Sequence, residues 1–200
     1  MSKLYLASSS PRRAELLQQI GVEFEVFSSP IDETPLSNEP PTDYVRRMAE
    51  EKAKSAYKKY SEEVGGNSSV PVFLAADTSV ILQGTILGKP TDQADHLKML
   101  EMLSGQTHQV ITGFAIHSSK HGLISRTVVT DVTFKSLTKP QIESYWLTGE
   151  PQDKAGGYGI QGYGAIFVDS IHGSYSNVVG LPLTEVSELL TQFGIQVWSA

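Results

Sequence analysis

LYLASSSPRR, at residues 4–13, is the stretch from which the fold can be predicted outward. Its first four residues are nonpolar and typical of a short buried strand, which three serines then interrupt. Ser10 followed by Pro11 predicts a helix start, because hydroxyl residues commonly cap helices and proline suits the first helical position. Leu16 contributes to the nonpolar face of this helix, and Gly21 ends it. The stretch therefore predicts a strand, a serine-rich turn and a helix N-terminus.

Two arginines, Arg12 and Arg13, fall in the first turn of that helix. The free backbone N–H groups and the positive end of the helix dipole already favour an anion there. Arginines oppose the same dipole, so helix propensity does not explain their presence. They suit a bound polyanion, to which their planar guanidinium groups can each donate two parallel hydrogen bonds. The alternative interpretation is an ordinary turn with solvated arginines.

Composition limits the classes of protein that the chain can represent. Its 200 residues suffice for one large or two-lobed domain over residues 1–200, and 40% hydrophobic and 19% charged residues are ordinary for a globular chain. No membrane-length nonpolar run, signal-peptide pattern or cysteine is present, so the cytoplasm is the expected location and no membrane partner is expected. A net charge of −6 argues against a nucleic-acid partner, so a phosphate site requires a local basic cluster.

Hydrophobic patterning predicts the remaining elements. Strands are expected at residues 22–27, 72–82, 108–117, 123–135 and 165–168, and helices at residues 42–60, 91–104, 138–148 and 182–193. Residues 28–41 are predicted as a loop, residues 65–69 as a flexible surface connection, and Gln83-Gly84 as a hairpin turn. Helices alternate with strands, but the hairpins require antiparallel pairs. The expected fold class is therefore α/β with a mixed sheet.

Asp77 interrupts the nonpolar strand predicted at residues 72–82. An ionised carboxylate in such a position is costly unless a cation or hydrogen bonds compensate it. A strand that ends at Ala76 is the alternative, and it would still place Asp77 at a strand end, where α/β sites commonly form. Because perturbed carboxylates cluster at functional sites, Asp77 is a candidate for one.

Three lysines could supply a basic cluster together with the two arginines. Lys52 falls on the nonpolar stripe of the predicted helix at residues 42–60, where it either extends to solvent or reaches a partner in a cleft. Lys89 lies between a glycine and a proline, and Lys154 precedes a glycine-rich run. Each lysine alone fits an ordinary surface position, whereas together they fit a polyphosphate.

Residues 157–162 match the letters of the dinucleotide-binding pattern G-x-G-x-x-G. That motif must follow a strand and open a helix, whereas here a charged turn precedes it and a strand is expected after it, so the dinucleotide interpretation is rejected. A glycine loop that lets backbone approach a ligand stays open. Asp32 and Glu33 are oxygen donors in a loop and suit Mg²⁺ or Mn²⁺, with a solvated acidic turn as the alternative.

The order of the short motifs resembles a known family. The motifs are Ser8-x-Ser10-Pro11-Arg12-Arg13, Asp32-Glu33-Thr34, Glu51-Lys52-Ala53, Ala76-Asp77-Thr78, Gly88-Lys89-Pro90, Ser104-Gly105, Asp153-Lys154-Ala155-Gly156, Tyr158-Gly159-Ile160-Gln161-Gly162 and Val179-Gly180-Leu181-Pro182. This set resembles the Maf family of nucleoside triphosphate pyrophosphatases from end to end. The resemblance implies two lobes around a central cleft, a fold similar to that of inosine triphosphate pyrophosphatases, a divalent metal, a cytoplasmic protein and often a homodimer.

The resemblance also assigns roles residue by residue. Asp77 matches the proposed catalytic carboxylate of the family, and with Glu33 it would hold Mg²⁺ or Mn²⁺. The matching substrate-binding positions are Ser8, Ser10, Arg12, Arg13, Lys52, Thr78, Lys89, Lys154 and Gln161. The implied reaction is the hydrolysis of a nucleoside triphosphate to the monophosphate and diphosphate. A phosphatase that releases orthophosphate from the γ end is an alternative.

Three of these positions bear on the base. Arg12, Thr78 and Gln161 resemble the residues at these positions in the branch of the family that acts on dTTP and UTP. In the branch that acts on 7-methyl-GTP, the same positions resemble Trp, Gln and Glu. A Gln amide offers the donor and the acceptor that uracil and thymine require. The expected substrates are thus dTTP, UTP and modified uridine triphosphates, in a house-cleaning role linked to cell-division control. The family's association with septum formation leaves a non-catalytic nucleotide-binding regulator as the competing function.

Overall fold

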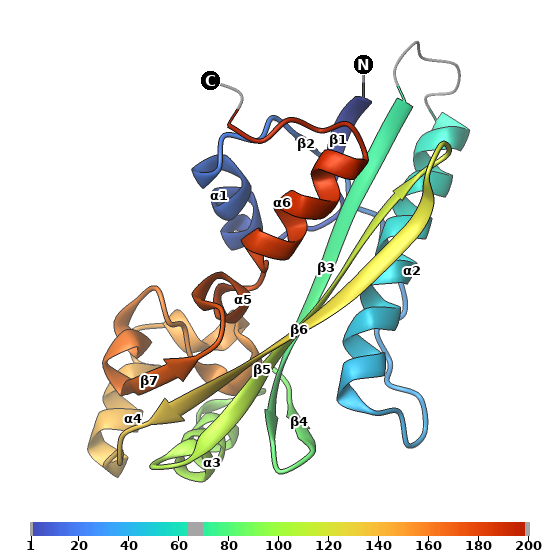
Figure 1. Ribbon diagram of the computed structural model, residues 1–200. Helices are drawn as coiled ribbons and strands as arrows, with labels where there is room; N and C mark the ends of the chain where they lie inside the picture. Colours follow the sequence, from blue (N-terminus) through green and yellow to red (C-terminus); the bar gives the residue numbers. More distant parts are fainter. Residues whose placement is uncertain (1, 64–69, 199–200) are drawn as a thin grey trace. The chain divides into compact units, whose positions relative to one another are not determined.

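The computed structural model describes residues 2–63 and 70–198 (Figure 1). Its strands are β1 (Ser2–Leu6), β2 (Glu25–Val26), β3 (Val70–Leu82), β4 (Thr85–Leu87), β5 (Thr107–Ser118), β6 (Gly122–Phe134) and β7 (Val168–His172). Its α-helices are α1 (Pro11–Gln19), α2 (Pro41–Glu63), α3 (Gln93–Leu103), α4 (Lys139–Trp146), α5 (Tyr175–Val179) and α6 (Leu183–Gln192). Short 3-10 helices follow α4: η1 (Glu150–Asp153), η2 (Ala155–Gly157) and η3 (Tyr163–Phe167).

The strands of the described residues form one mixed sheet in the order β2-β1-β3-β5-β6-β7, with β4 paired to β3. β1 runs parallel to both β2 and β3, whereas β3 pairs with β4 and β6 pairs with β7 in antiparallel fashion. The predicted α/β class with a mixed sheet is therefore confirmed. The hairpin turn is confirmed as well: Gln83 and Gly84 both have positive φ, and Leu82 pairs with Thr85.

Several predicted boundaries are wrong for identifiable reasons. The strand expected at residues 22–27 shrinks to the exposed pair Glu25–Val26, and the strand expected at residues 165–168 is mostly η3, with β7 beginning at Val168. The helix expected from Thr91 is capped instead by Asp92, whose side chain accepts from the Asp95 N–H. The α5 helix was not predicted, and the connection predicted at residues 65–69 lies outside the described residues.

The chain divides into two compact units. Unit 1 comprises Met1–Asp77, Thr112–Val128 and Gly180–Ala200, and unit 2 comprises Thr78–Ile111 and Val129–Val179. The chain therefore passes from unit 1 to unit 2 between Asp77 and Thr78. The domain prediction for residues 1–200 stays a prediction.

In unit 1, α2 packs directly on the sheet. A Cβ atom at Gly113 of β5 would overlap the backbone of Val45 in α2, so glycine is required for this close approach. The small side chains of Ala49, Ala53 and Ala56 continue the contact against Phe73. Figure 1 shows α1 and α6 on the opposite side of β1 and β3 from α2. This packing fixes the face of α2 from which Lys52 extends.

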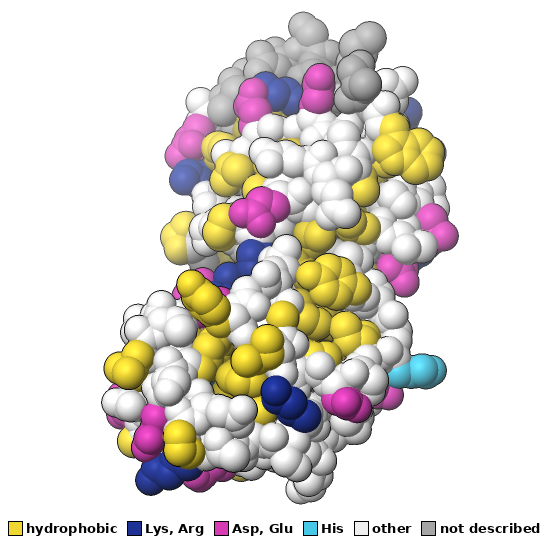
Figure 2. All heavy atoms as spheres, turned by 90° about the vertical axis from the view of Figure 1, so that its left-hand side faces the viewer, with side chains coloured by type: hydrophobic (Ala, Val, Ile, Leu, Met, Phe, Trp, Pro, Cys, Tyr) yellow, Lys and Arg dark blue, Asp and Glu magenta, His cyan; other side chains and the backbone are white. Residues whose placement is uncertain are grey.

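Unit 2 has its own core, formed where β3–β6 meet α3, α4 and the glycine-rich segment. Its buried residues include Leu100, Phe134, Tyr145, Tyr158 and Phe167. Figure 2 shows that nonpolar side chains also gather on the surface that carries α4 and β7. The exposed large nonpolar residues of this unit are Met102, Val129, Leu147, Tyr163, Ile166 and Tyr175. Such a nonpolar surface is better suited to contact aromatic rings and other nonpolar groups than to bind a polyphosphate.

Over residues 2–63 and 70–198, no helix combines the length and the nonpolar character that a membrane crossing requires.

Candidate functional site

The serine turn between β1 and α1 is held by Ser8. Its buried Oγ atom accepts hydrogen bonds from the Arg13 Nη1–H at 2.9 Å and the Ser10 N–H at 3.2 Å. Ser10 occupies the predicted cap position of α1, but its side chain makes no capping hydrogen bond, so that part of the prediction is wrong. In this turn the Ser8 hydroxyl instead holds both the Ser10 backbone and the Arg13 side chain.

Arg13 is fixed at both ends of its guanidinium group. Its Nε–H donates to the carbonyl oxygen of Gly180 at 2.9 Å, in addition to the bond to Ser8. Burial lowers the pKa of Arg13, and the charge of Arg12 adds to this, whereas the carboxylates of Asp77 and Glu33 act in the opposite direction. Arg13 therefore lies in the electric field of both candidate metal ligands.

Lys52 forms ion pairs with the carboxylates of both Glu33 and Asp77. Its Nζ atom lies 2.7 Å from Glu33 Oε1 and 2.7 Å from Asp77 Oδ1. The side chains of Lys52 and Asp77 are only 15% and 13% exposed, whereas that of Glu33 is 58% exposed. Lys52 thus pairs with carboxylates at a mostly buried position rather than extending to solvent. The alternative of a strand ending at Ala76 is wrong, because β3 continues to Leu82.

The loop that carries Glu33 is tied to α2 by residues that the sequence did not single out. Arg47 donates to Glu39 through Nε at 2.6 Å and Nη2 at 2.7 Å, and Nη2 also donates to the Thr34 carbonyl at 3.1 Å. The Tyr44 hydroxyl donates to the Glu33 carbonyl at 3.0 Å. The hydrogen bonds from Arg47 lower the pKa of Glu39 to about 2. Arg47 and Tyr44 both face a loop rich in acidic residues. The acidic composition of that loop is the sequence signal that could have identified them.

Glu33 and Asp77 fit a divalent cation. Within the part of the chain that the structure describes, no group of three or more His, Cys, Asp or Glu residues is placed to hold a metal. Two carboxylates that converge on one positive group nevertheless suit Mg²⁺ or Mn²⁺, because these ions commonly use one or two protein carboxylates and take their other ligands from water and phosphate.

Arg12 is half-buried in α1 and belongs to unit 1, whereas the remaining predicted site residues belong to unit 2. Lys89 and Gln161 are exposed, and the carbonyl of Gly88 accepts from the Gly156 N–H at 2.9 Å, which links the Lys89 turn to the glycine-rich segment. Lys154 Nζ donates to the Glu150 carbonyl at 2.7 Å and to Asp153 Oδ1 at 2.8 Å. Thr78, which directly follows Asp77 in β3, is half-buried. The 3-10 helix η2 leads into residues 157–162, and the 3-10 helix η3 follows them. A dinucleotide-binding motif would need a strand before it and an α-helix after it, so its rejection is supported.

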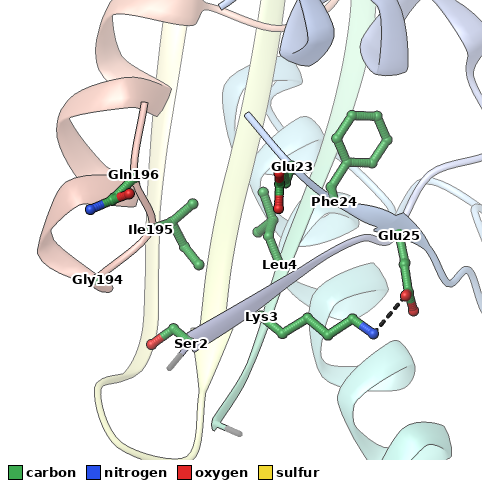
Figure 3. Close-up of a pocket in the computed structure, with 9 residues that line it drawn as sticks. All are labelled: Ser2, Lys3, Leu4, Glu23, Phe24, Glu25, Gly194, Ile195 and Gln196. Carbon is green, nitrogen blue, oxygen red and sulfur yellow. Dashed lines mark ion pairs between the residues drawn. The ribbon is translucent and has the colours of Figure 1, made fainter. Parts of the chain in front are cut away.

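A pocket of about 510 Å³ opens near the start of β1 (Figure 3). It is lined by residues 2–4, 23–25 and 194–196, and none of the predicted site residues contributes to it. Lys3 Nζ lies 2.6 Å from Glu25 Oε1, and Glu23 adds a second acid. With its lysine neutralised, this pocket is poorly suited to a triphosphate, in contrast to the turn after β1.

The fold and the site together define a mixed α/β protein in which Arg13, Lys52, Glu33 and Asp77 all lie in unit 1 and Lys52 pairs with both carboxylates. The chain belongs to the Maf-like protein family, whose model matches residues 3–193.

Known relatives cover nearly the whole chain. A protein from Colwellia psychrerythraea, named dTTP/UTP pyrophosphatase, is 50% identical over 192 residues, covering 96% of this chain and 89% of the relative. A protein of the same name from Pasteurella multocida is 47% identical over 199 residues and 98% of each chain. Among solved structures, a nucleoside-triphosphatase (dITP/XTP pyrophosphatase) from Mycobacterium abscessus matches over 96% of this chain and 94% of its own, at 14% identity and a TM-score of 0.43.

Proposed function

We propose that this protein is a nucleoside triphosphate pyrophosphatase that hydrolyses dTTP, UTP and modified uridine triphosphates to the monophosphate and diphosphate. The observation that carries the proposal is the position of Lys52 between Glu33 and Asp77, with Arg13 in the field of both carboxylates. This combination of cationic and anionic groups suits phosphoryl chemistry, in which positioning and charge neutralisation supply most of the catalysis. The names of the relatives support the same activity.

In the proposed reaction, a water oxygen attacks the α-phosphorus while the bond to the bridging oxygen breaks. The leaving diphosphate takes the bonding electron pair, and Asp77 accepts the proton of the attacking water. Arg13, held by Ser8 and Gly180, and Lys52 bind phosphate oxygens. Glu33 and Asp77 would hold Mg²⁺ or Mn²⁺, which when bound would neutralise further phosphate charge. Ser10, Arg12, Lys89 and Lys154 complete the proposed binding residues.

Base selection is assigned to Arg12, Thr78 and Gln161. The exposed Gln161 amide can donate to a carbonyl of uracil and accept from its N–H group. Guanine presents two adjacent donors on the same edge and is matched less well. Cytosine, which a flipped amide could accommodate, should be rejected less strongly than the purines. A cytoplasmic location and a homodimer remain predictions.

A product assay over the common nucleoside triphosphates, with and without Mg²⁺ or Mn²⁺, tests the proposal. The expected result is a monophosphate and diphosphate, formed only with a divalent cation and fastest with dTTP and UTP. Release of orthophosphate would contradict the proposed reaction. Tight nucleotide binding without turnover under any metal condition would instead favour the non-catalytic regulator.

A further inference from the structure

The segment that carries Gln161 is held by two side chains outside the proposed binding residues. Tyr145 is the buried, penultimate residue of α4, and Glu150 begins η1. Both lie in unit 2, as does the whole segment at residues 159–164. We call this pair of side chains the clamp.

The two side chains of the clamp accept hydrogen bonds from the backbone on both sides of Gln161. The Tyr145 hydroxyl accepts from the Gly159 N–H at 3.0 Å and donates to Glu150 Oε1 at 2.7 Å. Glu150 in turn accepts from the Tyr163 N–H at 2.7 Å and the Gly164 N–H at 3.0 Å. Gln161 is therefore flanked by fixed amides two residues before it and two residues after it, while its own side chain stays exposed.

The close approach of the clamp explains the glycines of this segment. A Cβ atom at Gly162 would overlap the Glu150 carboxylate, and one at Gly164 would lie 2.8 Å from the Tyr145 hydroxyl. At Gly159 a Cβ atom would lie 2.7 Å from Lys154 Cε as well as 3.1 Å from Glu150 Oε1, so Lys154 shares in this close approach. The glycines of this segment thus allow protein side chains to approach the backbone closely, whereas in a phosphate-binding loop they would allow a phosphate to do so.

The protonation states fit this hydrogen-bond pattern. Burial raises the pKa of Tyr145, and its hydrogen bond to Glu150 raises it further, so the hydroxyl keeps the proton that it donates. Burial also acts to raise the pKa of Glu150, but hydrogen bonds from Tyr145, Gly164 and Tyr163 outweigh it and the pKa is lowered. An ionised carboxylate accepts hydrogen bonds only, and here it meets three donors.

We propose that Tyr145 and Glu150 are positioning residues for base recognition, which fix the segment at residues 159–164 so that the Gln161 amide faces the pyrimidine of the nucleotide. This inference rests on the proposed reading of uracil by Gln161. Neither clamp residue is among the residues proposed to bind phosphate or to act as the base, so we expect the loss of the clamp to act on selectivity and KM rather than on the chemical step.

Tyr145→Phe tests the proposal, because it removes the hydroxyl and keeps the ring that packs against His96 and Phe167. Tyr175→Phe, an exposed tyrosine of the same unit, is the matched control. Hydrogen exchange measured by mass spectrometry should show residues 156–166 exchanging about tenfold faster in Tyr145→Phe only. The KM for UTP should rise about tenfold, the preference for UTP over GTP should fall by a similar factor, and kcat should change little.

A double-mutant comparison separates positioning from general loosening. If Tyr145 acts through Gln161, then Tyr145→Phe should no longer alter the UTP preference in a Gln161→Ala background. Unchanged exchange in Tyr145→Phe, or faster exchange with an unchanged UTP preference, overturns the inference while the proposed function stands. If Gln161→Ala itself leaves the preference unchanged, the proposed base recognition is wrong, and the inference fails with it.

Discussion

The Lys52 ammonium group on α2 lies 2.7 Å from the Asp77 carboxylate in the middle of β3. The pair offsets the cost of burying each charge, because the two side chains are only 15% and 13% exposed. A triphosphate would bring further negative charge toward Lys52, and a divalent cation would bring positive charge toward Asp77. The pair can therefore be understood as a site whose two charges each match one component of a metal–nucleotide complex.

Asp77→Asn should fold normally and lose activity by roughly 10²–10⁴-fold, because the amide keeps the shape of the side chain but cannot accept the proton. Diphosphate release measures the activity, and thermal unfolding measures the stability. Asp169→Asn, on the exposed face of β7, is the matched control and should retain full activity. Full activity in a folded Asp77→Asn protein would make Asp77 a structural residue.

Lys52→Ala should lower kcat/KM for UTP on the order of 10²-fold, with changes in both kcat and KM, because its charge is proposed to neutralise phosphate in the ground state and the transition state. Lys54→Ala, two residues along the same helix and exposed, provides the control. Lys89→Ala should weaken binding and turnover in the same direction. Steady-state kinetics of the three variants make the comparison, and equal kinetics for Lys52→Ala and Lys54→Ala would exclude a role for Lys52 in the reaction.

Arg47→Gln should release the loop that carries Glu33 and destabilise the protein by about 1–2 kcal/mol, because Arg47 bonds both oxygens of Glu39 and the Thr34 carbonyl. Activity should fall and a higher Mg²⁺ concentration should be needed to restore it. Arg46→Gln, whose ion pair with Asp43 is exposed, should change neither property. A normal Mg²⁺ requirement in Arg47→Gln would show that the loop does not depend on Arg47.

His108 should make stability depend on pH in a defined window. Burial lowers the pKa of His108 to about 4, so between pH 4 and 6.5 the unfolded chain binds a proton that the folded chain does not. The contribution is fully present above pH 6.5 and is lost as the pH falls, by about 3 kcal/mol at most. Urea unfolding at pH 7.5 and 5.0 should show a smaller difference in His108→Gln than in the wild type. Equal differences in the two proteins would exclude His108 as the cause.

Features governed by local sequence pattern were predictable. Asp77 stands out because it breaks a nonpolar run, and the Gln83-Gly84 turn follows from residues that tolerate positive φ. The nonpolar stripe of α2 predicts that Lys52 lies on the inward side of the helix, and its side chain is only 15% exposed in the structure. In each case a period or a turn preference within a few residues carries the information.

Features that depend on contacts between distant residues were not predictable. Residues 22–27 alternate nonpolar residues with glutamates like a strand, but only Glu25 and Val26 pair with β1. Arg47 and Tyr145 resemble ordinary helix residues, and their partners are known only once the loops that they hold have been folded. The glycines at residues 159–164 pointed to a close backbone approach, yet the sequence could not identify the Glu150 carboxylate as what approaches.

The most direct test of the central claim is hydrolysis of UTP in ¹⁸O-labelled water with Mg²⁺, followed by mass spectrometry of the products. Attack on the α-phosphorus predicts one ¹⁸O atom in UMP and none in the diphosphate. Label in the diphosphate would place the attack on the β-phosphorus, and labelled orthophosphate with UDP would place it on the γ-phosphorus. Either of the latter two results would contradict the proposed reaction.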